Sequence, residues 1–139
     1  MAITVLAIDD TKSITEVIRL FLESSGYIVK TETDPRKGIE VAQKGGVDLV
    51  LLDIIMPDMD GYQVWDILKS DERTQEIPIV MLTAQAILMH TPKDFLYGLY
   101  GLVAKPFSRD QLLEVIGNAM KVTKRESYHK LLAAAKKKQ

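Results

Sequence analysis

The sequence predicts a doubly wound α/β fold, in which helices cover both faces of a five-stranded parallel sheet. Short apolar runs alternate along the chain with segments of helical hydrophobic spacing, five times in succession. Strict alternation of this kind is typical of a parallel sheet, because right-handed crossovers place each helix against the sheet. The third run contains the unbroken apolar segment LVLL, as expected of a strand that is covered on both faces.

Five runs are the expected strands. The second alternates in polarity and the fifth is short, whereas the first and fourth are mostly apolar. The expected strands are residues 4–8, 27–33, 48–52, 78–82 and 102–104.

The first two helices are predicted from their spacing and their end signals. Apolar residues recur at helical intervals over 14–22, before a stop at Gly26. Asp34 and Pro35 then supply an N-cap and a proline at the first helical position. We expect this second helix to end at the glycine pair 45–46.

The spacing and capping signals of the three later helices are less regular than those of the first two. Apolar residues within 64–68 predict a helix after the turn at 57–61. Residues 87–94 contain an apolar cluster and a fresh capping signal, so the fourth helix is expected to be irregular. Residues 108–120 begin with a capping box and keep helical spacing to their end.

Polar side chains stand where four of the expected strands end. Asp9 and Asp10 follow the first strand, Asp53 the third, Thr83 the fourth and Lys105 the fifth. Ligands of doubly wound sheets bind beyond the carboxyl ends of the strands, where the winding direction reverses. Each group alone could simply cap a helix, but five at matching positions predict a functional site.

The residue types at this edge indicate phosphoryl chemistry. Three converging carboxylates repel one another unless a cation joins them, and an all-oxygen set suits Mg²⁺. A carboxylate beside Mg²⁺ can act as a nucleophile towards phosphorus, and Asp53 is the best candidate. Thr83 would donate its hydroxyl to a phosphoryl oxygen, while Lys105 would supply a compact positive charge.

These residues resemble the receiver domain of two-component response regulators. The resemblance covers residues 3 to about 120, through the aspartate pair, "DIIMPDMDG", "MLTA" and "KPF", in that order. It implies a flavodoxin-like (βα)5 fold with strand order 2-1-3-4-5. It also implies a receiver domain over residues 1–120, followed by a basic helical extension or tail at 121–139.

The resemblance assigns roles to the acidic residues. Asp53 would accept a phosphoryl group from a sensor histidine kinase or a histidine phosphotransfer protein. Asp10 and Asp53 would bind Mg²⁺ directly, and Asp9 would act mainly through water. The backbone carbonyl of Ile55 would complete the protein's metal ligands.

The resemblance also implies a conformational switch. Thr83 would move towards the phosphoryl group, which the backbone of Ala84 and the Lys105 side chain would also bind. The peptide bond between Lys105 and Pro106 is expected to be cis. Leu102 stands where receivers usually place the aromatic half of the switch, and Tyr100 is the alternative aromatic residue.

The expected output is a change in partner binding rather than turnover of a substrate. The resemblance places the output face on the fourth helix, the fifth strand and the last helix, for a downstream effector or a homodimer. The apolar residues 87–89 fit such an interface, or simple burial under an irregular helix.

Two other function classes fit the residues less well. An aspartate-nucleophile phosphatase needs a general acid two residues after the nucleophile, and Ile55 cannot donate a proton. A flavodoxin-like cofactor binder needs a donor-rich loop after the first strand. Residues 9–12 instead bring two negative charges to that loop.

Composition narrows the partners and the compartment. The chain has 139 residues, no cysteine, and no apolar stretch close to the roughly 20 residues that span a bilayer. It also lacks the basic start of a signal peptide, so we expect a cytoplasmic protein that does not bind membranes. Residues 1–120 carry 11 basic and 18 acidic residues, which disfavours direct nucleic-acid binding.

Overall fold

The computed structural model describes residues 2–84, 100–121 and 133. Its strands form a parallel sheet, and the strand order 2-1-3-4-5 in that sheet confirms the predicted fold class and strand order. The expected fourth helix and nearly all of the basic extension lie outside the described residues. Among the residues that are described, no helix is long and apolar enough to cross a membrane.

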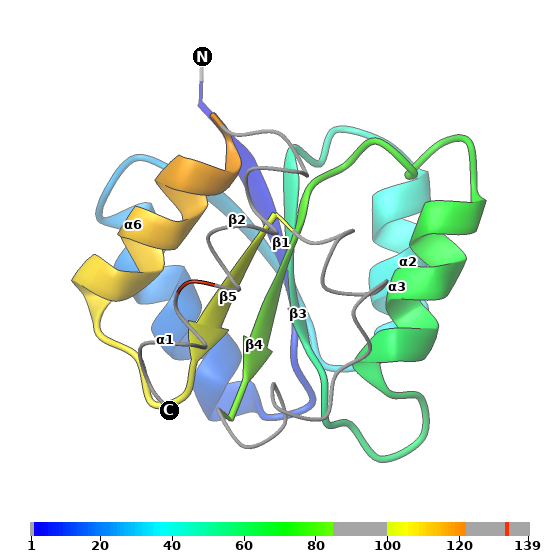
Figure 1. The fold of residues 1–139 in the computed structure, drawn as a ribbon, viewed down its shortest axis with the longest axis horizontal. Helices are drawn as coiled ribbons and strands as arrows, with labels where there is room; N and C mark the ends of the chain where they lie inside the picture. Colours follow the sequence, from blue (N-terminus) through cyan, green and yellow to red (C-terminus); the bar gives the residue numbers. More distant parts are fainter. Residues whose placement is uncertain (1, 85–99, 122–132, 134–139) are drawn as a thin grey trace. The chain divides into compact units, whose positions relative to one another are not determined.

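The chain divides into two compact units, and the first is Met1–Ile79. Its strands are β1 (Thr4–Ile8), β2 (Ile28–Glu32) and β3 (Leu49–Asp53), and its helices are α1 (Lys12–Glu23), α2 (Pro35–Gln43) and α3 (Gly61–Ser70) (Figure 1). β1 lies between the other two strands, with Val5 beside Val29 and Leu49. Every residue of β1 and β3 is buried, which explains their continuous apolar pattern.

The second unit is Val80–Gln139. It contains nearly all of β4 (Ile79–Thr83), together with β5 (Gly101–Ala104) and α6 (Arg109–Ala119). β4 and β5 pair in parallel, with Thr83 beside Ala104. The predicted capping box at the start of α6 is confirmed, because Ser108 and Gln111 each accept a hydrogen bond from the other's backbone N–H.

Four of the five strands differ by one residue from those expected. β2 is one residue shorter at each end than 27–33, and β5 begins one residue before 102. β3 and β4 each begin and end one residue later, so Asp53 and Thr83 are the last residues of their strands. Asp48 lies just before β3, and both its side chain and its backbone form hydrogen bonds to Thr4, the first residue of β1. Its carboxylate accepts from the Thr4 N–H at 2.8 Å, and its own N–H donates to the Thr4 carbonyl at 2.8 Å.

Two helical glycines predict opposite effects of the same substitution. A Cβ at Gly38 would lie 2.6 Å from Ile8 Cδ1 and 2.7 Å from Ile8 Cγ1, whereas a Cβ at Gly117 would meet no atom within 4 Å. We expect Gly38→Ala to lower the free energy of unfolding by about 1 to 3 kcal/mol through overpacking. Gly117→Ala should raise it by about 1 kcal/mol through helix propensity. Urea unfolding of both variants tests this, and equal shifts would contradict it.

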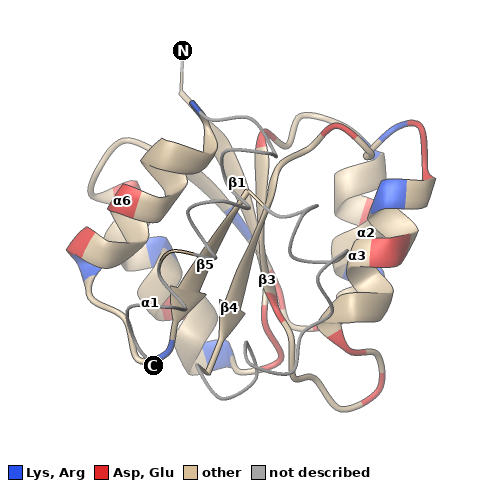
Figure 2. Cartoon of the chain, in the orientation of Figure 1, with Lys and Arg blue, Asp and Glu red and all other residues tan. Residues whose placement is uncertain are grey.

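Asp71 is the C-cap residue of α3. Both acidic and basic positions occur along α2 and α3 (Figure 2). The Asp71 carboxylate accepts from the Arg73 backbone N–H at 2.8 Å, from Arg73 Nη2 at 2.8 Å and from Gln43 Nε2 at 3.1 Å. These bonds, those from the Arg73 side chain above all, lower the pKa of Asp71 from 3.8 to about 2.

This depressed pKa makes one component of stability depend on pH. The folded state holds the carboxylate more strongly than the unfolded state does, so the contribution is complete above pH 3.8 and is lost as pH falls towards 2. We expect the difference in unfolding free energy between wild type and Asp71→Asn to narrow over that interval. Urea unfolding at several pH values measures it, and a constant difference would contradict the expectation.

Candidate functional site

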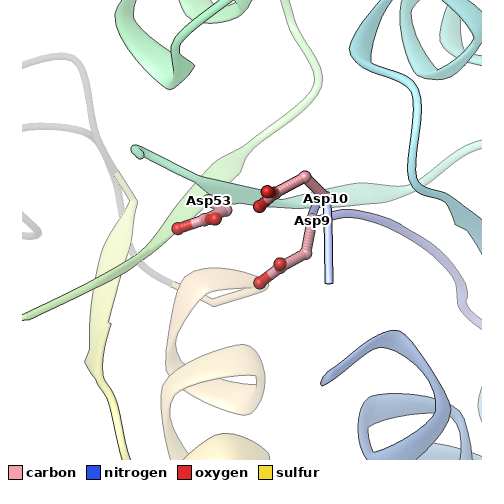
Figure 3. A group of neighbouring side chains, drawn as sticks. All are labelled: Asp9, Asp10 and Asp53. Atoms are coloured by element: carbon pink, nitrogen blue, oxygen red, sulfur yellow. The ribbon is translucent and has the colours of Figure 1, made fainter. Parts of the chain in front are cut away.

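Three carboxylates gather where β1 and β3 end. Asp9 and Asp10 follow β1, and Asp53 is the last residue of β3. Ile8 lies beside Leu52 in the parallel register, so the next residues along the chain, Asp9 and Asp53, emerge side by side. One carboxylate oxygen from each aspartate lies within 4.8 Å of the other two (Figure 3). The structure thus brings together the three acids that the sequence predicted at this edge.

The three aspartates differ in their exposure to solvent. Asp9 is fully buried and Asp53 is 5% exposed, whereas Asp10 is exposed. Buried carboxylates are costly unless they are hydrogen-bonded or paired with positive charge. The Thr11 backbone N–H donates to Asp9 Oδ1 at 3.0 Å, which offsets part of that cost. The cluster therefore suits a cation that arrives from the solvent side of Asp10.

The orienting role of Thr11 was not predicted. An aspartate two residues before the N-cap position of a helix is the sequence signal that indicates it, because such a side chain often accepts from the backbone N–H two residues on. Thr11 is also the N-cap residue of α1, although its own side chain makes no capping hydrogen bond. The turn therefore fixes Asp9 through the backbone, independently of the threonine hydroxyl.

The loop between β3 and α3 closes on itself beside Asp53. The Gly61 N–H donates to the Ile54 carbonyl at 2.8 Å. Ile54 and Met56 are buried, whereas Ile55 between them is 61% exposed. A capping box of Asp60 and Gln63 starts α3, a signal in the sequence that the turn prediction overlooked. The loop is thereby anchored at both ends.

The remaining predicted site residues belong to the second unit. Thr83 is buried, and its hydroxyl donates to the Ala84 carbonyl at 3.0 Å. The Lys105 N–H donates to the Thr83 carbonyl at 2.9 Å, and the bond from Lys105 to Pro106 is cis. Leu102, at the position where an aromatic residue was expected, is half-buried, as is the alternative Tyr100.

Comparisons with known proteins agree with this arrangement. The chain matches the response regulator receiver domain family over residues 5–117. The DNA-binding dual master transcriptional regulator RpaA of Synechocystis sp. is 34% identical over 121 residues, 87% of this chain and 50% of that protein. Response regulator Rre1 of the same organism is 32% identical over 119 residues, 85% of this chain and 52% of that protein.

A solved structure shows the same fold. The chemotaxis response regulator CheY4 of Vibrio cholerae is similar with a TM-score of 0.79 and 29% sequence identity. The match covers 86% of this chain and 99% of that one.

The family match and the curated relatives place this sheet, with the acidic cluster at its carboxyl edge, in a class of signalling domain. The chain belongs to the receiver domain family of two-component response regulators. It spans about half the length of the curated relatives that it matches. The phosphatase and cofactor-binder alternatives find no support in these matches.

Proposed function

We propose that residues 1–120 act as a phosphoacceptor switch in which Asp53 receives the phosphoryl group. The observation that carries the proposal is the set of three carboxylates whose oxygens lie within 4.8 Å of one another around this residue. Membership of the receiver family supplies the phosphodonor class, a sensor histidine kinase or a histidine phosphotransfer protein. Residues 121–139 form a basic extension outside this switch.

The donor set fits Mg²⁺. Magnesium binds oxygen at about 2.0 to 2.1 Å, so two of its ligands lie at most about 4.2 Å apart. Carboxylate oxygens within 4.8 Å reach that separation by small side-chain rotations, or one of them acts through a retained water. Asp10 and Asp53 are the direct ligands in this proposal, with the Ile55 carbonyl, and Asp9 acts through water. When bound, Mg²⁺ neutralises charge on the phosphoryl oxygens.

The chain's own residues carry out the transfer. A carboxylate oxygen of Asp53 forms the bond to phosphorus while the bond from phosphorus to the donor's imidazole nitrogen breaks, and that nitrogen keeps the electron pair. The Lys105 ammonium and the Ala84 N–H bind phosphoryl oxygens. Thr83 donates its hydroxyl to the phosphoryl group after releasing the Ala84 carbonyl, to which it donates in the structure.

The output of this switch is altered partner binding. We propose that a downstream effector or a second copy binds at the face formed by the fourth helix, β5 and α6. Leu102 responds to Thr83 in this proposal, and Tyr100 is the alternative aromatic residue for that role. The domain also catalyses its own dephosphorylation and has no other substrate. It works in the cytoplasm, where its phosphodonors act.

Phosphorylation by a small-molecule donor tests the proposal. The full chain is incubated with acetyl phosphate and either Mg²⁺ or EDTA, and its intact mass is measured. We expect the mass of one phosphoryl group to be added with Mg²⁺ and none with EDTA. An unchanged mass with Mg²⁺, or equal uptake with EDTA, would refute the proposal, and repeated turnover of added phosphoesters would favour a phosphatase.

A further inference from the structure

The first unit leaves one edge of its sheet open at β2. Within the described residues, β2 stands at the end of the strand order and pairs with β1. Ile28 donates from its N–H to the Ile3 carbonyl at 3.0 Å, and Glu32 accepts from the Asp9 N–H at 3.2 Å. Successive residues of a strand direct their backbone groups to opposite sides. The N–H and C=O groups of Val29 and Thr31 therefore face away from β1.

Arg19 of α1 reaches this open edge. Its Nη1 donates to the Val29 carbonyl at 3.0 Å, and its Nη2 donates to Thr31 Oγ1 at 3.1 Å. Nη1 also lies 3.4 Å from a carboxylate oxygen of Glu23, one turn further along α1. The planar guanidinium matches two acceptors at once, which a lysine ammonium on its flexible stem does less well.

An uncovered β2 would favour strand pairing. Open edges present unpaired backbone groups to other chains, and proteins commonly protect them with charged side chains. The sequence of β2, IVKTE, is rich in β-branched residues, and Ile28 is 50% exposed. A second chain could therefore pair with β2 if no side chain blocked this edge.

We propose that Arg19 is an edge guard that prevents β2 from pairing with the β2 strand of a second copy. Two identical strands can pair antiparallel through their outward residues, with Val29 of one copy opposite Thr31 of the other. The guanidinium already donates to the Val29 carbonyl and fills the space beside Thr31. The pairing requires both that carbonyl and that space. The same register sets Lys30 opposite Lys30, so this exposed lysine opposes pairing by charge repulsion.

Sedimentation velocity over a range of protein concentrations tests the guard. The full chain is compared as wild type, as Arg19→Met, which keeps an apolar stem but removes the donors, and as Arg36→Met. Arg36 is exposed on α2, so the latter variant is a control for the lost charge. We expect Arg19→Met to strengthen self-association at least tenfold and Arg36→Met to follow the wild type. Adding Lys30→Thr to Arg19→Met should strengthen it further.

A suppressor variant locates the contact. Thr31 directs its N–H to the open edge, so Thr31→Pro removes an outward donor without breaking the ladder to β1. Adding it to Arg19→Met should return self-association to the wild-type level. In Arg19→Met without the proline, the Val29 and Thr31 amides should gain protection from hydrogen exchange as the protein concentration is raised.

Unchanged self-association in a natively folded Arg19→Met variant would overturn the proposal, as would a dimer that Thr31→Pro leaves intact. If circular dichroism shows that Arg19→Met is unfolded, Arg19→Lys decides. That variant keeps the charge and can reach one acceptor but not both, so we expect its self-association to be strengthened by a smaller factor. If Arg19→Lys then self-associates no more strongly than the wild type, the proposal is overturned.

Discussion

Replacing Asp53 with asparagine is expected to abolish phosphoryl uptake from acetyl phosphate and Mg²⁺. The carboxamide is nearly the same size as the carboxylate but lacks the negative oxygen that attacks phosphorus. It also removes one of the three acids, whose oxygens lie within 4.8 Å of one another. Intact mass measurement should detect only the unmodified chain.

Asp58→Asn is the matched control for that loss. Asp58 lies in the loop that follows Asp53 but is exposed, and it is not among the three clustered acids. This variant should take up one phosphoryl group, as the wild type does. Uptake by Asp53→Asn, or its absence from both variants, would contradict the assignment of the nucleophile.

Asp10→Asn should have opposite effects on stability with and without Mg²⁺. In metal-free buffer the variant loses a repulsion between carboxylates, and because Asp10 is exposed we expect a gain of only about 1 kcal/mol. With Mg²⁺ at about 100 times its dissociation constant, the wild type gains about 2.7 kcal/mol. A metal affinity lowered by about tenfold deprives the variant of about half of that gain, and one lowered by about 100-fold deprives it of most of it.

Thermal unfolding with and without Mg²⁺ shows whether the wild type and Asp10→Asn exchange their order of stability. Asp9→Asn provides the contrast, because the Asp9 carboxylate accepts from the Thr11 N–H at 3.0 Å and is fully buried. Its replacement disturbs that hydrogen bond, so the metal-free gain should be smaller or absent. An Asp10→Asn variant that responds to Mg²⁺ as the wild type does would exclude Asp10 as a ligand.

The sequence was sufficient to predict the sheet and the acidic cluster because both follow from repeated patterns. Alternation of strands and helices predicts a parallel sheet, and a parallel sheet collects the carboxyl ends of its strands at one edge. Asp10 and Asp53, 43 positions apart in the chain, could therefore be placed together before their coordinates were known. The strand ends were wrong by one residue because backbone pairing, rather than hydrophobicity, sets them.

Other features depend on contacts that no local pattern encodes. By helix propensity alone, Gly38 is an unfavourable residue within a helix. The structure shows why a larger residue does not fit, because a Cβ at this position would lie 2.6 Å from Ile8 Cδ1. Arg19 has the position of an ordinary surface arginine, and its role follows only from the distance to the β2 edge. The hydrogen bond from the Thr83 hydroxyl to the Ala84 carbonyl depends on one side-chain rotamer.

Direct mapping of the modified residue is the most decisive measurement. After treatment with acetyl phosphate and Mg²⁺, borohydride reduction converts an aspartyl phosphate to homoserine, which peptide mass mapping then locates. The proposed function predicts homoserine at position 53 and at no other aspartate. Homoserine at Asp9, Asp10, Asp58 or Asp60 in place of Asp53, or a phosphoryl group that resists reduction, would contradict it.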